Sequence, residues 1–192
     1  MEMTSLVRMS RSYRRFDEEH HVEGEVLREL VELAQYSPTG NNMQPLKFWL
    51  SNTPDMNAKI YPNLGWAGSL PHWHGPEEGE RPSAYIIILG DRDIQLTFGV
   101  DHGIAAQSIM LGAAEKGLGG CMIGSVKRKA LAANLEISDR YQILLVLALG
   151  KPAETVVTEP LKPGGEVKYY RDEDGVHHVP KRSQEELIVH DV

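Results

Sequence analysis

The chain has 192 residues, a length typical of one domain, and its hydrophobic content of 41% is enough for a buried core. A formal net charge of -7 excludes a surface built throughout to attract nucleic acid. The single cysteine, Cys121, excludes an intrachain disulfide, and the longest apolar run, 143–149, is too short to span a bilayer. Because the N-terminal segment also lacks the apolar stretch of a signal peptide, we expect a soluble, cytoplasmic protein with no membrane partner.

The first part of the chain contains helical and strand-like patterns in turn. Apolar residues at helical spacing predict an amphipathic helix over 22–36, which Pro38 ends. The expected elements that follow are a strand at 47–51, a short helix and turn over 52–62, and a buried strand at 85–89. Residues 61–82 are rich in proline, glycine and tryptophan, which predicts a long irregular loop of the kind that often carries function.

The segment 98–116 predicts the central helix. Its middle part is apolar or small on nearly every side, so the helix is expected to be buried all round. In so short a chain, such burial suggests help from a second subunit. A strand at 121–123, a helix over 127–135 and a buried strand at 142–149 are expected after it.

From Lys151 onward, prolines, glycines and charges dominate. Within this tail, Asp174–Gly175 separates two strand-like runs, 167–170 and 176–179, which is a hairpin signal. The tail is too polar to pack alone, and its composition leaves open a disordered end or an arm that wraps a partner.

Several catalytic signatures are missing from the sequence. It has no P-loop and no G-x-S-x-G elbow, and Met122 interrupts the only G-x-G-x-x-G candidate. Cys121 lies among glycine and apolar residues and is expected to be a buried, inert thiol. The remaining candidates are histidine pairs without a third ligand, which are interpreted as solvated loop residues and not as a metal site: His20 and His21, His72 and His74, His177 and His178.

Three segments carry polar side chains suited to a phosphorylated heterocycle. Arg11, Arg14 and Arg15 place three guanidiniums around Ser12 within five positions, which suits a phosphate or, alternatively, a solvated basic face. Lys181 and Arg182 form a second basic pair near the other end. Residues 37–45 are rich in amides and hydroxyls, so they suit the edge of a heterocycle or form an ordinary capped turn.

Together these segments resemble the nitroreductase family of FMN enzymes. The resemblance covers most of the chain and depends on four motifs in order: R-S-x-R-x-F at 11–16, S-P-T-G-x-N-x-Q-P at 37–45, E-x-G-L-G at 115–119, and the basic pair at 181–182. It implies an α+β fold in which helices flank a mostly antiparallel central sheet. It also implies an intertwined homodimer, with 1–150 as a single FMN-binding domain and 151–192 as the arm of that domain, exchanged with the partner.

The resemblance also assigns residues to FMN. Arg11, Ser12, Lys181 and Arg182 would hold the phosphate, and Arg14 would face the ribityl chain and the pyrimidine edge. The other subunit would supply Pro38, Thr39, Asn42 and Gln44. The strand end Cys121, Met122, Ile123 and Gly124 would lie beside the isoalloxazine, where the backbone N–H groups of Ile123 and Gly124 reach flavin N5 and O4. The loop 61–82, with Trp66 and Trp73, is the expected wall of the substrate pocket.

Two departures from the family pattern affect this assignment. Ser10 stands where many relatives have a basic residue, and Ile123 stands where some have a glutamate. The implied activity is ping-pong transfer of hydride from NADH or NADPH, through flavin N5, to a small acceptor such as a nitroaromatic or a quinone. No catalytic side chain is required, because the flavin performs the chemistry.

Three other functions remain open from the sequence. One is a specialised flavin enzyme, such as a dehalogenase or a metabolite oxidase. The second is a flavin-binding sensor without catalysis. The third, a nucleic-acid binder that uses a basic patch, is disfavoured by the overall negative charge.

Overall fold

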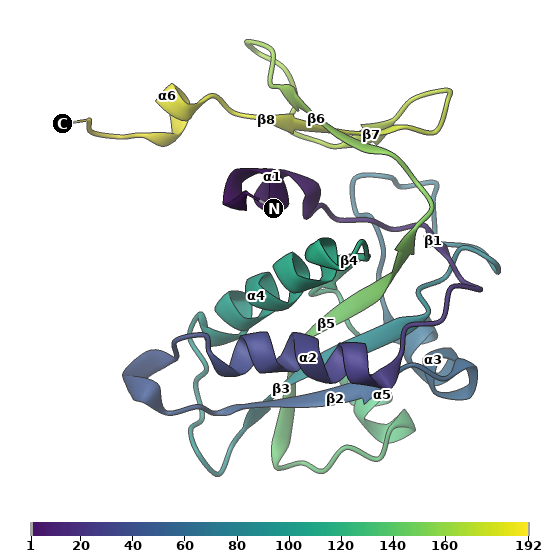
Figure 1. Cartoon of the computed structure of the whole chain (residues 1–192), viewed down its shortest axis with the longest axis vertical. Helices are drawn as coiled ribbons and strands as arrows, with labels where there is room; N and C mark the ends of the chain where they lie inside the picture. The colour runs from purple at the N-terminus through teal and green to yellow at the C-terminus, as the bar shows by residue number, and fades with distance from the viewer. Residues whose placement is uncertain (1, 192) are drawn as a thin grey trace.

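A computed structural model describes residues 2–191 of the chain (Figure 1). Its helices are α1 (Met3–Met9), α2 (Gly24–Gln35), α3 (Pro54–Ile60), α4 (Asp101–Glu115), α5 (Arg128–Asn134) and α6 (Gln184–Leu187). Its strands are β1 (Phe16–Asp17), β2 (Leu46–Ser51), β3 (Ala84–Asp91), β4 (Gly119–Ile123), β5 (Tyr141–Pro152), β6 (Val156–Pro160), β7 (Tyr170–Arg171) and β8 (His177–Lys181). None of the helices within 2–191 combines the length and the apolar character needed to cross a bilayer.

The central sheet consists of five strands that all pair in antiparallel fashion. The long β5 pairs with β3 along one side and with β4 and then β1 along the other, and β2 completes the sheet beyond β3. The continuous apolar runs predicted the two strands at the centre, and all eight residues of β3 are buried. The α+β fold, with helices that flank an antiparallel sheet, is therefore confirmed.

Side chains alternate between two cores along β3. Ile86 and Ile88 contribute to the core under α2 and α4, which lie side by side on one face of the sheet (Figure 1). Tyr85 and Ile87 contribute to the core on the opposite face, which also contains Leu131 of α5. Because successive strand residues point to opposite faces, one continuous apolar run supplies both cores.

Helix α4 packs closely on α2, and small residues make this approach possible. A Cβ atom at Gly112 would lie 2.2 Å from Leu33 Cδ1 of α2, so a larger residue there would require the Leu33 side chain to move. The prediction that α4 is buried all round is wrong for the single chain, because α2 and the sheet cover only part of its surface. The uncovered part, called here the open stripe, consists of residues that are exposed or half-buried: Gly103, Ile104, Gln107, Ser108 and Leu111.

The tail forms a second, three-stranded sheet beside α1 (Figure 1). β6 and β8 are parallel, and β7 and β8 are antiparallel, with Gly175 at φ 78° in the connection. This confirms the predicted hairpin, although only Tyr170 of the first predicted run lies in β7 and Val176 precedes β8. Helix α1 was not predicted, because no apolar periodicity marks it and none of its residues is buried.

Candidate functional site

The basic segment 11–15 lies along the edge of β4. Ser12 forms an isolated parallel bridge with Gly120, and the Tyr13 amide donates to the Gly120 carbonyl at 2.9 Å. A Cβ at Gly120 would lie 2.6 Å from the Ala148 carbonyl oxygen, so a glycine is required where the two segments meet. The arginines then diverge: Arg14 is buried, while Arg15 Nε pairs with Glu80 Oε2 at 3.2 Å.

Strand β8 faces this segment from the other side. Because side chains alternate along a strand, His177, Val179 and Lys181 share one face, and all three line the same cavity. This cavity of about 340 Å³, called here the basic pocket, is lined by Ser10, Arg11, Ser12, Arg14, Gln107, Met110, Met122, Tyr169, His177, Val179 and Lys181.

The lining of the basic pocket suits an anion. It contains three permanent cations, Arg11, Arg14 and Lys181, and no carboxylate. Arg11 Nη2 donates to the Val7 carbonyl at 2.6 Å, but Arg11 Nε is buried and has no hydrogen-bond partner within 2–191. A guanidinium N–H left in this way is available to a bound oxyanion, and Arg binds phosphate oxygens with directed, charge-assisted hydrogen bonds.

Arg14 is held in a fixed orientation at the base of this pocket. Its Nη1 donates to the Ser12 carbonyl at 3.2 Å and lies 3.2 Å from His177 Nε2. Its guanidinium also stacks on the Tyr169 ring, 4.5 Å from the ring centroid. The buried carboxylate of Glu154 accepts hydrogen bonds from the Arg14 and Arg15 amides, which fixes the backbone as well.

His177 is fully buried, so the interpretation of this residue as a solvated loop histidine is wrong. Burial, reinforced by the Arg14 charge, lowers its pKa to about 4, so the ring is neutral near pH 7. A guanidinium nitrogen such as Arg14 Nη1 can only donate hydrogen bonds, so Nε2 of His177 must be the acceptor. The proton of the neutral imidazole is therefore on Nδ1 of His177. Nδ1 is buried and has no partner among the residues described, which leaves a second unused donor beside the pocket.

His178, its neighbour, points to the other face of β8. Its ring nitrogens lie 2.9 Å from Asp172 Oδ2 and 3.1 Å from Glu159 Oε2. Hydrogen bonding to Asp172 and Glu159 raises the pKa of His178. Adjacent histidines therefore have pKa values shifted in opposite directions, because the strand places one in the interior and the other between two carboxylates.

The loop 61–82 contacts residues of the tail that lie at or next to the basic pocket. The Ser69 amide donates to the Tyr169 hydroxyl at 3.2 Å, and Arg171 stacks on the Trp73 ring, 4.3 Å from its centroid. Arg171 is in turn paired with Glu154 at 2.8 Å. Trp66 belongs instead to the core around α5, where its ring lies 6.0 Å from that of Tyr61. Of the two predicted wall residues, Trp73 is thus linked to the residues that hold Arg14.

The structure brings together five of the residues assigned to FMN: Arg11, Ser12, Arg14, Met122 and Lys181. Cys121 and Ile123 alternate with Met122 and are buried in the opposite core, and burial raises the pKa of the Cys121 thiol, as expected of an inert cysteine. Gly124 follows β4 with open space at its Cα. Arg182 lies outside the basic pocket, with Nη1 3.1 Å from Glu186 Oε1.

The residues of 37–45 form a separate group, at the N-terminal end of α4. The Gly40 amide donates to Asp101 Oδ1 of that helix at 3.0 Å, and the Gln44 amide donates to Thr39 Oγ1 at 3.1 Å. Asn42 and Gln44 have φ values of 54° and 50°. Within one chain, Pro38, Thr39, Asn42 and Gln44 do not line the basic pocket.

Besides Ser10, sequence reasoning missed five of the residues that line the basic pocket: Gln107, Met110, Tyr169, His177 and Val179. Four of them occupied periodic positions in the sequence. Gln107 and Met110 are three apart on the predicted helix, and His177 and Val179 are two apart on the predicted strand, in line with Lys181 beyond its end. Tyr169 occupied no such position, because it precedes β7 in a loop.

Comparison with known proteins identifies the family. The sequence profile of the nitroreductase family matches residues 7–69 and 78–151, more than half of the chain. A nitroreductase family protein from Streptococcus pneumoniae has the same fold at 17% identity, with a TM-score of 0.69 over 85% of this chain and 96% of that one. An FMN-dependent nitroreductase from Clostridium difficile matches at 21% identity, with a TM-score of 0.64 over 90% and 94%. A protein from Exiguobacterium sibiricum, solved in complex with FMN, matches at 20% identity, with a TM-score of 0.66 over 80% and 90%. The chain therefore belongs to the nitroreductase family, with the oxidoreductase fold of that family.

Proposed function

We propose that this protein is an FMN-dependent oxidoreductase that takes hydride from NADH or NADPH and delivers it to a small oxidised acceptor, such as a nitroaromatic or a quinone. The observation that carries the proposal is the convergence of Arg11, Ser12, Arg14 and Lys181, from the two ends of the chain, on one basic pocket. FMN would supply the atom that accepts and donates hydride, so the protein needs to provide only binding, orientation and electrostatics.

The residues of the pocket divide this work by position. Arg11, Ser12 and Lys181 are the groups suited to the phosphate, since Arg11 Nε lacks a partner in the described chain and Lys181 is exposed. Arg14 is more deeply buried and immobilised, which suits a fixed positive charge beside the pyrimidine edge, where it would stabilise negative charge on the reduced ring. The backbone N–H groups of Ile123 and Gly124 are assigned to N5 and O4.

We propose further that the active form is a homodimer. The open stripe of α4 leaves Ile104 and Leu111 half-exposed on an otherwise apolar helix. Leu187, Ile188 and Val189 are exposed at the C-terminal end, which projects away from the body (Figure 1). A second subunit that covers these apolar surfaces would also be able to bring its 37–45 loop to the basic pocket, which that loop does not reach within one chain.

Names of similar proteins support the cofactor. One structural relative is called an FMN-dependent nitroreductase, another an NAD(P)H:FMN oxidoreductase, and a third was solved with FMN. Because these chains are 20–21% identical to this one, their acceptors are not transferred to it. We place the protein in the cytoplasm, on the grounds of its single cysteine and its lack of a long apolar segment.

The test is an absorption spectrum of the purified protein, followed without oxygen as NADH and then NADPH are added. We expect a flavin spectrum that bleaches with one donor and recovers when a nitroaromatic or a quinone is added. A flavin spectrum that neither donor bleaches would contradict the reductase activity and favour a flavin-binding sensor. Colourless protein that FMN does not reconstitute would contradict the cofactor assignment itself.

A further inference from the structure

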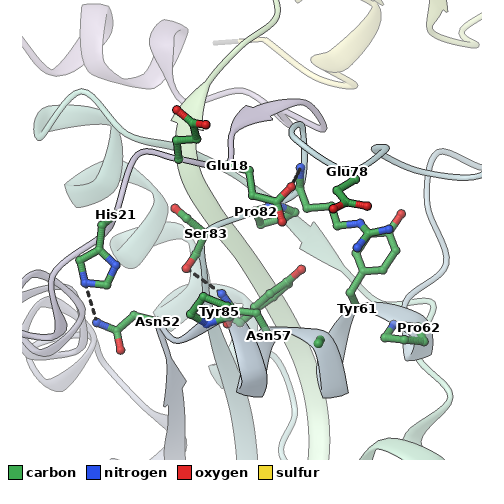
Figure 2. A pocket seen from close by; sticks show the side chains of 14 residues that line it. Glu18, His21, Asn52, Asn57, Tyr61, Pro62, Glu78, Pro82, Ser83 and Tyr85 are labelled. Carbon is green, nitrogen blue, oxygen red and sulfur yellow. Dashed lines mark hydrogen bonds between the residues drawn. The ribbon is translucent and has the colours of Figure 1, made fainter.

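A second cavity lies between α3, the turn after β1 and the segment 78–83 that leads into β3 (Figure 2). Its volume is about 790 Å³, which falls in the range usual for small-molecule sites. None of its lining residues lines the basic pocket. The proposed flavin chemistry therefore leaves this cavity without a role.

The floor of the cavity has two hydroxyl groups that are unpartnered within the described part of the chain. Tyr85 is completely buried, and its hydroxyl has no hydrogen-bond partner within residues 2–191. Ser83 Oγ, two residues earlier, is also buried and unpartnered in the described chain. Burial raises the pKa of Tyr85, so the phenol keeps its proton and is a donor at every physiological pH. Buried polar groups almost always have partners, so two vacant hydroxyls that line one cavity indicate a ligand.

Several polar groups next to these hydroxyls are paired, which holds the floor in place, while Arg81 Nε is buried and has no partner among the described residues. Asn57 Nδ2 donates to the Ser83 carbonyl at 2.8 Å, while Asn57 Oδ1 accepts from Ser51 Oγ at 2.6 Å. Tyr61 donates its hydroxyl proton to the Pro76 carbonyl at 2.6 Å. Figure 2 shows Asn57 and Ser83 joined in this way next to Tyr85.

The rim of the cavity is acidic. Three carboxylates, Glu18, Glu19 and Glu78, line it together with one cation, Arg81. Glu18 Oε2 accepts from the Gly79 amide at 2.5 Å and so ties the turn after β1 to the rim, and Arg81 lies over the Tyr61 ring, 4.6 Å from its centroid. Figure 2 shows Glu18 and Glu78 above the floor residues. The three carboxylates outnumber the one permanent cation, so the rim favours a positive ligand.

The walls between rim and floor are apolar, with Pro54, Ala58, Pro62 and Pro82 among the lining residues. We propose that this cavity is a binding site for a small organic cation, an aromatic amine whose ring packs between these walls. Its ammonium group lies at the carboxylates of the rim, and an oxygen at its other end accepts a hydrogen bond from the Tyr85 hydroxyl. The site is distinct from the basic pocket, and a ligand bound there leaves the flavin in place.

The test uses the full-length protein as purified and two probes of similar shape. Tyramine has a phenolic oxygen at one end of its ring and an ammonium group at the other. 3-(4-Hydroxyphenyl)propanoate keeps the ring and the phenol but replaces the cation by an anion. Calorimetry should show that tyramine binds at least tenfold more tightly than the propanoate and that added salt weakens the binding. The absorption spectrum of bound flavin should not change when tyramine is added. Equal affinity for the two probes, displacement of flavin by tyramine, or no binding of tyramine would each overturn the proposal.

Substitutions locate the site. Tyr85→Phe removes only the unpartnered hydroxyl, so it should leave Tm unchanged or raise it. It should lower the affinity for tyramine roughly tenfold, the usual effect of one lost hydrogen bond. Glu78→Gln should lower the affinity of the protein for tyramine and should not lower its affinity for the propanoate. The matched control is Tyr36→Phe, at an exposed tyrosine of the α2 end, which should bind tyramine like the parent protein. Unchanged tyramine affinity in Tyr85→Phe would refute the site. Because the basic pocket is not involved, the affinities of these variants for tyramine do not depend on whether FMN binds.

Discussion

Arg14 Nη1 lies 3.2 Å from the Nε2 atom of His177, a residue 163 positions away along the chain. This contact joins the N-terminal basic segment to the tail and fixes the side chain that we assign to the flavin ring. Because Arg14 is always charged, the contact requires a neutral His177, and it makes the pairing of the two segments sensitive to pH.

The first prediction concerns the stability of the protein in acid. His177 has a pKa of about 4 in the folded chain and an ordinary value of 6.5 when unfolded, so between these values the unfolded state binds more protons. Stability should therefore fall as the pH falls from about 6.5 to about 4. The groups that set this pKa, besides burial, are Arg14, Glu154, Arg171 and His178. Thermal unfolding of His177→Gln should show a smaller loss of Tm than the parent over this range.

His178 provides the matched control, with the opposite sign. Its pKa is raised in the folded state, so its contribution is fully present below about pH 6.5 and is lost as the pH rises through the folded value. His178→Gln should thus differ most from the parent protein at low pH, and His177→Gln should differ most at neutral pH. The same pH dependence in both variants would contradict the assignment of the buried residue.

The second prediction concerns the affinity for FMN. Arg11→Ala and Lys181→Ala should each weaken FMN roughly ten- to a hundredfold, because each removes a charge-assisted hydrogen bond to phosphate. Circular dichroism should show that both variants keep the fold. Arg182→Ala should have a smaller effect, since Arg182 pairs with Glu186 outside the pocket, and Arg28→Ala on the exposed face of α2 is the control. If Arg11→Ala or Lys181→Ala binds FMN as tightly as the parent protein, the substituted residue does not bind the phosphate.

The third prediction compares the effects of substituting Gly120, which lies in β4, and Gly124, which follows that strand. Gly120→Ala would place a Cβ 2.6 Å from a backbone oxygen and 2.8 Å from Leu149 Cδ2, so it should destabilise the protein by about 1–3 kcal/mol. Gly124→Ala meets nothing within 4 Å, so its Tm should match that of the parent. Its FMN should be held less tightly, because the methyl group would lie against the ring. Unchanged FMN affinity in Gly124→Ala would contradict the position assigned to the isoalloxazine.

The fourth prediction tests the homodimer through the open stripe. Ile104→Glu places a charge in the centre of this apolar surface and should convert a dimer to a monomer in light-scattering measurements, with loss of bound FMN. Ala133→Glu is the control, because Ala133 is exposed on α5 at the opposite face of the sheet. A monomeric parent protein that retains FMN would contradict the dimer.

The fifth prediction concerns the tail. Deletion of the residues after Lys151 removes His177, Arg171 and Lys181, so it should abolish FMN binding and, by the arm-exchange proposal, the dimer. Deletion of the residues after Ser183 removes only α6 and the terminal residues. This shorter deletion should keep the basic pocket and lose the contact of the arm with the partner, so it separates FMN binding from dimer formation. A flavin-loaded dimer that lacks the whole tail would refute both roles.

The sequence alone determined most of the elements and the family. Apolar runs and helical periodicity depend on neighbouring residues, so β3, β5, α2 and α4 were recognisable without the fold. The hairpin in the tail was readable for the same reason, since Asp174–Gly175 marks its turn locally. Four short motifs in order were enough for the family, and the first three lie within the regions that the sequence profile matches, while the basic pair at 181–182 lies beyond them.

Only the tertiary structure decided which of these residues meet. Adjacent residues such as Lys181 and Arg182, or His177 and His178, look alike in sequence, but strand alternation sends one to the pocket and the other away from it. The environment of His177 depends on Arg14, more than 160 positions distant, and the cavity that Tyr85 lines depends on how α3 and residues 78–83 pack over β3. Burial and charge at a site depend on segments that are far apart in the chain, so they cannot be deduced from local sequence patterns.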